Sequence, residues 1–193
     1  MLVKTFSAAV FGIEAVPVTI EADVTRGVRY MLVGLPDAAV KESQQRIESA
    51  FRAVGLKWPG RQVIINMAPA DIRKEGASYD LPLAVGILAA AETVTGGRLE
   101  GMLLTGELSL DGTIKPVRGV LPMALEARAS GFRGMMVPAE NAPEAAVVDG
   151  IDVFGVHSLS EVLHYMRGEA NPAPVKVDIN ALFSHEGNRY DSD

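Results

Sequence analysis

The chain of 193 residues contains no cysteine, which excludes a disulfide framework and a metal site built from thiolates. Aromatic residues make up only 6%, so the core must be built mainly from aliphatic side chains. Because Glu92 interrupts the longest apolar stretch, no run of about 18 apolar residues exists and no membrane-spanning helix is predicted. The N-terminus alternates instead of forming a continuous apolar region, so no secretory signal is predicted and the cytoplasm is the expected compartment.

Nucleotide and metal motifs are also missing. No glycine is followed by lysine, so the phosphate-binding loop of P-loop ATPases cannot form within this chain. The dinucleotide fingerprint GxGxxG is absent as well. His157 and His164 fall near one helix face without a third ligand, so no metal site is predicted. We therefore expect no cofactor in this chain.

The sequence predicts one folded domain followed by an acidic segment. Apolar residues account for 48% of the chain, which suffices for a domain of about 150 to 170 residues, and we place it at 1–168. Residues 169–193 hold five acids against two bases and begin with prolines, so they are predicted to be a linker with at most a short helix near 179–183. Since no capping element or final strand ends the chain, we expect it to continue in a longer protein.

Hydrophobic periodicity predicts a mixed α/β fold with one sheet packed against helices. Strict alternation from Val16 to Ala22 indicates a strand, and an apolar stripe that follows Asp37 indicates a capped helix. The strands are predicted at 3–10, 16–22, 28–33, 62–67, 103–110, 134–137 and 151–156, and the helices at 37–54, 80–94, 119–130, 140–148 and 159–167.

Residues 73–80 (RKEGASYD) form a charged glycine turn that leads into the most apolar helix. Ser78 is predicted to lie near the N-terminus of this helix, where backbone N–H groups can hold an oxyanion. A nucleophilic hydroxyl also needs a base, for which Lys74 and Lys115 are the candidates. Neither lysine lies on an evidently buried face, so capping and turn geometry are the favoured interpretation of Ser78.

Two segments resemble the proteolytic domain of Lon proteases. Residues 105–119 (TGELSLDGTIKPVRG), followed by GFR at 131–133 and VPAEN at 137–141, carry the resemblance, together with KEGAS at 74–78. This places Ser78 at the Lon serine position, whereas Leu121 stands where Lon proteases have their catalytic lysine. Leucine can neither accept nor relay a proton, so the resemblance implies the fold without peptidase activity.

A closer resemblance is to the N-terminal domain of the magnesium-chelatase-like family represented by ComM, also called YifB. It is carried, in the expected order, by VGLP at 33–36, VKE at 40–42, IN at 65–66, APAD at 68–71, KEG at 74–76 and YDLP at 79–82. In this family a Lon-like domain of ribosomal protein S5 domain 2-like fold precedes an AAA+ ATPase module that forms homo-oligomeric rings. The resemblance therefore implies ATP and Mg²⁺ as cofactors of that module, and DNA branch migration during natural transformation as the activity.

Three hypotheses follow. The first is a non-catalytic domain of an AAA+ DNA-processing protein, which contributes to ring assembly or contacts DNA through the predicted phosphate contacts Arg61, Arg73 and Lys74. Residues 41–74 carry an excess of four positive charges, although solvated helix faces commonly do so. The second is a Ser/Lys hydrolase that uses Ser78 with Lys115 or Lys74. The third is a purely structural oligomerisation module.

Overall fold

The structure, a computed structural model, describes residues 1–181. Its strands are β1 (Leu2–Phe11), β2 (Glu14–Thr25), β3 (Tyr30–Val33), β4 (Gln62–Ala68), β5 (Met102–Leu104), β6 (Glu107–Leu108), β7 (Ile114–Lys115), β8 (Gly134–Pro138) and β9 (Asp152–Val156). Its helices are α1 (Ala38–Lys41), α2 (Ser43–Ala53), α3 (Asp80–Ala90), α4 (Val120–Ala129), α5 (Ala142–Ala146) and α6 (Leu159–Met166), with short 3₁₀ turns at Gly97–Leu99 and Ala139–Asn141.

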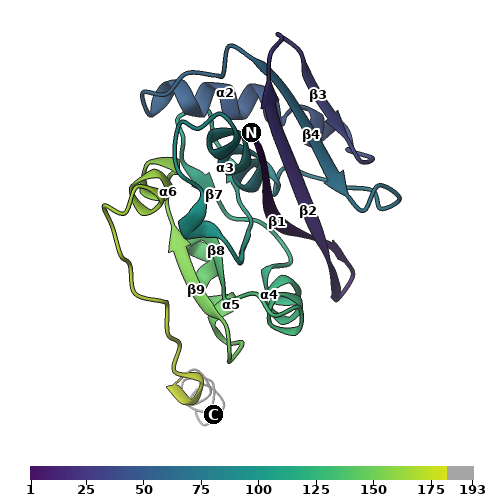
Figure 1. Cartoon of the computed structure of the whole chain (residues 1–193). Coiled ribbons are helices and arrows are strands. Elements are labelled where there is room, and N and C mark those ends of the chain that lie inside the picture. Colours follow the sequence, from purple (N-terminus) through teal and green to yellow (C-terminus); the bar gives the residue numbers. More distant parts are fainter. Residues whose placement is uncertain (182–193) are drawn as a thin grey trace.

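Seven strands form one mixed sheet in the order β3-β4-β2-β1-β5-β8-β9, and helices flank it (Figure 1). The pairs β3–β4, β1–β5, β5–β8 and β8–β9 are parallel, whereas β2 runs antiparallel to both of its neighbours. The short strands β6 and β7 form a separate antiparallel ribbon. The predicted mixed α/β fold is therefore confirmed.

The β1–β2 hairpin forms as its sequence pattern predicts, with paired residues from Leu2 opposite Asp23 to Phe11 opposite Glu14. Every second residue of β2 from Val18 to Val24 is buried, because a strand directs alternate side chains to opposite faces. These buried side chains meet α3, in which all eleven residues are buried. A helix without a polar face is stable only inside a core, so its composition determines its central position.

Two helical layers complete the core. On one face of the sheet, α2, α3 and α6 bury a cluster that includes Ile47, Leu83 and Leu163. On the opposite face, α4 packs against β1, β2 and β8 and α5 packs against β9, and Met123 and Ala145 belong to a second cluster there. Burial of each large aliphatic side chain contributes about 1.5 to 3 kcal/mol. No helix within residues 1–181 is long and apolar enough to cross a membrane.

Two predicted elements are divided in the structure. The helix predicted at 37–54 begins as expected, because Asp37 Oδ1 accepts the N–H of Val40 at 2.8 Å, but it is interrupted at Glu42 into α1 and α2. The strand predicted at 103–110 is wrong as a single element. Gly106 leaves the sheet because its carbonyl accepts the N–H of Leu81 at 3.1 Å, and β6 then turns away into the ribbon with β7.

The segment that follows α6 lies along the body of the domain (Figure 1). The N–H of Val175 donates to the carbonyl of Val153 in β9 at 2.8 Å, and Arg98 donates to the carbonyl of Ala170 at 3.2 Å and to the Asn171 side chain. Of the helix predicted near 179–183, residues 179–181 are helical, and residues 182 and 183 lie outside the described residues.

Candidate functional site

The turn before α3 carries Ser78 and is fastened on two sides. The Ser78 carbonyl accepts the N–H of Gly106 at 3.0 Å, which ties the turn to the segment after β5. Asp37 accepts the N–H of Gly76 through Oδ2 at 3.0 Å while its other oxygen caps α1. The N-cap of α3 is Tyr79, and no side chain caps this helix. The capping interpretation of Ser78 is therefore wrong, because its carbonyl and not its hydroxyl fixes the turn.

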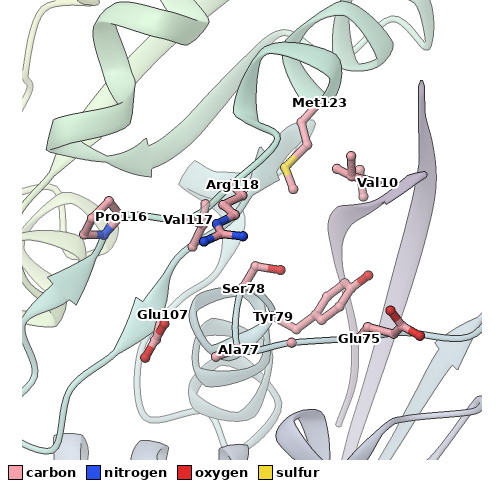
Figure 2. Close-up of a pocket in the computed structure, with 12 residues that line it drawn as sticks. Val10, Glu75, Ala77, Ser78, Tyr79, Glu107, Pro116, Val117, Arg118 and Met123 are labelled. Atoms are coloured by element: carbon pink, nitrogen blue, oxygen red, sulfur yellow. The ribbon is translucent and has the colours of Figure 1, made fainter. Parts of the chain in front are cut away.

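Ser78 faces a pocket of about 420 Å³ between β1, the serine turn, the β6–β7 ribbon and the start of α4 (Figure 2). In this view Glu107 and Glu75 lie on opposite sides, and the Ser78 hydroxyl and the Arg118 guanidinium both point toward the middle. The lining residues are Ala8, Val10, Glu75, Gly76, Ala77, Ser78, Tyr79, Glu107, Pro116, Val117, Arg118 and Met123.

The pocket offers polar groups, among them the carboxylates of Glu75 and Glu107, but no lysine amino group for the serine. Arg118 carries a guanidinium group, which donates hydrogen bonds and does not accept them. Burial raises the pKa of Tyr79 well above its ordinary value, with further contributions from the charges of Asp37 and Glu75, so the phenol stays protonated. Neither group can remove the proton from a hydroxyl near neutral pH. The arrangement is therefore suited to binding more than to nucleophilic catalysis.

Lys74 is fully buried, which overturns its prediction as a phosphate contact. Its ammonium donates to the carbonyl of Gly34 at 2.7 Å and to the carbonyl of Pro69. Its backbone N–H also donates to the carbonyl of Leu35 at 3.0 Å. Lys74 thus joins the loop after β3 to the loop after β4, and its amino group is held by carbonyls and not by Ser78.

We expect Lys74→Met to lower the free energy of unfolding by about 2 to 3 kcal/mol, because two carbonyls would lose their donor. Burial lowers the pKa of Lys74, opposed by the charge of Asp71, so the folded chain releases this proton at lower pH than the unfolded chain. The unfolding free energy of the native chain should therefore rise with pH up to the ordinary lysine value of 10.5. Urea titrations followed by circular dichroism at several pH values would show this rise in the native chain and its loss in the variant.

Lys41→Met is the matched control for this prediction, because Lys41 is exposed on α1. We expect it to change stability by less than about 0.5 kcal/mol. Equal stability of Lys74→Met and Lys41→Met would contradict the structural role of the buried ammonium.

The other predicted residues lie apart from the pocket or at its rim. Lys115 is exposed on β7 and does not line the pocket. Arg73 is also exposed, but it pairs with Glu75 at 3.2 Å. Arg61 is exposed immediately before β4. Leu121 is the second residue of α4, and its backbone N–H donates to Glu144 Oε1 at 3.1 Å. Among residues 1–181, no three His, Cys, Asp or Glu side chains come together as metal ligands.

The chain is similar to known proteins over most of its length. Residues 20–141 match the family described as subunit ChlI of Mg-chelatase. The chain belongs to this family. It is 46% identical over 171 residues to an uncharacterized protein of Mycobacterium tuberculosis, a match that covers 88% of this chain and 34% of the relative.

Two relatives of this family carry the names that the sequence resemblance predicted. The chain is 40% identical over 162 residues to YifB of Salmonella typhimurium, which covers 83% of this chain and 32% of that protein. It is 37% identical over 169 residues to competence protein ComM of Haemophilus influenzae, which covers 87% and 33%. The chain thus spans about a third of the length of the curated relatives it matches.

The more distant resemblance to Lon proteases is confirmed as well. Lon protease 2 of Bacillus subtilis is 30% identical over 145 residues, which covers 72% of this chain and 25% of the relative. Ser78, which the sequence resemblance places at the Lon serine position, lines the pocket described above, just before the start of α3. Leu121, which the sequence resemblance places at the Lon lysine position, is not among the residues that line this pocket.

The sequence did not single out two residues of the site. Arg118 projects its guanidinium into the pocket, and Asp37 holds the serine turn through its second oxygen. The sequence signal for Asp37 was its capping position alone, which explains only one of its two hydrogen bonds. Arg118 lies inside the Lon-like segment at 105–119, but no pattern there indicates which side chain enters a pocket.

Proposed function

We propose that this chain is a non-catalytic N-terminal domain of a magnesium-chelatase-like AAA+ ATPase that moves DNA branches, as the resemblance to the ComM family implies. The observation that carries the proposal is a serine pocket that no lysine amino group lines. Lys74 is committed to the carbonyls of Gly34 and Pro69, and Leu121 replaces the lysine of Lon proteases. A pocket that keeps the serine but has lost its partner fits a domain whose role is assembly or binding.

The alternative of a Ser/Lys hydrolase has little structural support. Ser78 would need a neutral amino group within hydrogen-bond distance. Neither Lys74 nor Lys115 makes a hydrogen bond to Ser78 within residues 1–181. The family match supports an AAA+ family member, and the name of competence protein ComM favours the DNA-processing role over a hydrolase. ATP and Mg²⁺ are then expected in the ATPase module, with a homo-oligomeric ring as the working assembly in the cytoplasm.

The proposal is tested on the full-length protein that contains this chain. We expect ATP- and Mg²⁺-dependent movement of a branched DNA substrate, and a loss of about tenfold or more when residues 1–168 are deleted. Ser78→Ala should leave branch movement and ATP hydrolysis within about twofold of the native rates, as should the control Ser160→Ala.

Two outcomes would contradict the proposal. The first is proteolysis of an unfolded substrate that Ser78→Ala abolishes and Ser160→Ala does not, which would establish the hydrolase. The second is a full-length protein that hydrolyses ATP and moves DNA branches equally well without residues 1–168.

A further inference from the structure

Four basic residues, which we call the basic end, lie together at one end of the sheet. Arg26 and Arg29 belong to the turn between β2 and β3, and Lys57 and Arg61 belong to the connection from α2 to β4. All four are exposed. In the part of the chain that the structure describes, none of them forms an ion pair or a side-chain hydrogen bond, unlike Arg73, which is paired with Glu75.

The sheet register brings these two connections together. Thr25 at the end of β2 lies opposite Gln62 at the start of β4, so Arg26 and Arg61 are the next residues outward on neighbouring strands. The backbone N–H of Val63 donates to the carbonyl of Arg29 at 2.8 Å. Both connections lie at the top of Figure 1.

Lys57 is fixed at the same end by its neighbour in sequence. Trp58 packs edge-on against Tyr30 of β3, with ring centroids 5.5 Å apart. Since β2, β4 and β3 are adjacent and strands lie about 4.8 Å apart, the basic end spans roughly 10 Å across the strands.

The basic end is positively charged, whereas the chain as a whole is negatively charged. Residues 24–31 and 55–63 carry four bases and no acid, whereas the whole chain has a net charge of −6. The nearest acid in the sequence, Asp23, pairs with the N-terminal ammonium at 3.9 Å. Four exposed cations therefore create a local positive potential that attracts a polyanion. Three of the four are arginines, whose forked guanidinium groups bind phosphate oxygens in a bidentate geometry.

We propose that the basic end binds the phosphate backbone of double-stranded DNA. The choice of DNA among polyanions rests on the function proposed above, whereas the surface itself rests on the grouping of four unpaired cations. Four cations in a strip of about 10 Å fit the dense charge of a duplex, which carries one phosphate charge per about 1.7 Å of helix axis when both strands are counted.

The aromatic side chains favour a duplex over a single strand. Proteins that bind single strands stack bases on exposed aromatic rings. Here Tyr30 and Trp58 pack against the core, and Trp58 also contacts Phe51 at a centroid distance of 6.1 Å. No free ring is left at the basic end for stacking within the described structure. Contact with the backbone alone gives binding without sequence preference.

A lipid surface fits this end less well. Stable membrane binding requires an amphipathic helix or several apolar side chains that enter the bilayer. In the two connections only Val28 is a strongly exposed large apolar residue, at 92% exposure. One valine beside four cations is insufficient for that role, so the phosphate backbone of a duplex is the better partner.

The test measures binding of the chain to a fluorescent 30-base-pair duplex of arbitrary sequence, by anisotropy between 50 and 200 mM NaCl, with ~30 base pairs exceeding the span of the basic end. Four neutralised phosphates predict a slope of about −3.6 for the logarithm of the association constant against that of salt concentration. Arg26→Gln/Arg61→Gln should reduce this slope to about −1.8 and weaken binding at least about tenfold at low salt.

Arg128→Gln/Arg167→Gln is the matched control, because both arginines are exposed and lie outside the basic end. It changes the net charge equally and should alter binding by less than about threefold. The proposal is overturned by an equal loss in this control or by no binding of the native chain at low salt. Tighter binding of a single strand overturns it too, as does duplex displacement by phosphatidylserine vesicles that bind through the same arginines.

The full-length protein separates this inference from the proposed function. If it moves DNA branches while Arg26→Gln/Arg61→Gln leaves duplex binding by the chain unchanged, the basic end is wrong and the function stands. If the chain binds duplex through the basic end but the full-length protein neither hydrolyses ATP nor moves branches, the surface stands and the function fails.

Discussion

Replacing Gly34 by alanine is expected to lower the free energy of unfolding by about 4 kcal/mol or more. Gly34 has φ of +109°, and a Cβ atom placed on it would lie 2.1 Å from the carbonyl oxygen of Met67. The obstacle is the backbone of β4, which cannot move without disturbing the pairing of Val33 with Asn66. The same glycine supplies the carbonyl that holds Lys74, so one added methyl group would disturb the sheet and the buried ammonium together.

Gly60→Ala is the control for this substitution, since a Cβ atom there would meet nothing within 4 Å. We expect it to be neutral or slightly stabilising, by up to about 1 kcal/mol, because alanine reduces the freedom of the unfolded chain. Urea unfolding followed by circular dichroism compares both variants with the native chain. A Gly34→Ala variant within about 1 kcal/mol of native stability would show that the loop after β3 relaxes more easily than the structure implies.

Asp80→Asn is expected to cost about 3 to 5 kcal/mol, because it breaks a buried ion pair and leaves a cation without its partner. Asp80 accepts two hydrogen bonds from Arg46, at 2.7 and 2.9 Å, and one from the N–H of Leu108 at 3.0 Å. Its side chain is only 1% exposed. Burial raises the pKa of Asp80 while its partners, Arg46 first, lower it, so the carboxylate depends on these partners for its charge. One carboxylate thereby joins α2, the start of α3 and β6.

A double-mutant cycle with Arg46→Met tests this interpretation. If the pair acts as a unit, the combined variant should be less destabilised than the sum of the single variants by about 1 kcal/mol or more. The exposed pair Arg52 and Glu48, at 3.4 Å on α2, serves as the control and should show coupling below about 0.5 kcal/mol. Additive effects at Asp80 and Arg46 would contradict a joint role.

The fold could be predicted from the sequence wherever burial follows a regular period. The alternation in β2 and the uniformly apolar α3 lie where the pattern places them. Alternate residues are buried in β2 and every residue is buried in α3, so the hydrophobic pattern of the sequence matches the burial directly. The divided elements could not be predicted in the same way. The break in the strand expected at 103–110 depends on two hydrogen bonds: the N–H of Gly106 donates to the Ser78 carbonyl, and the Gly106 carbonyl accepts the N–H of Leu81. Both partners are more than twenty residues away in sequence.

The candidate site, too, could be predicted only in part from the sequence. The sequence placed Ser78 at a turn before the apolar helix, and the structure confirms that turn. Lys74 was predicted to be a surface base because a charged residue in a loop is ordinarily solvated. Its burial becomes visible only when the loops that supply the Gly34 and Pro69 carbonyls are brought together. The sequence marked Arg61 but not Arg26, because the two become neighbours only through the register of β2 and β4.

The hydrogen bond between Val175 and Val153 has a mechanical consequence for anything joined to the C-terminal side of this domain. Gly168, with φ of +75°, is where the sequence suggests a joint. The chain is instead held to β9 by the hydrogen bond of Val175, and Arg98 holds it earlier by donating to the Ala170 carbonyl. Residues 170 and 175 are therefore attached to the domain, and we expect a module joined after this segment to pivot beyond Val175 and not at Gly168.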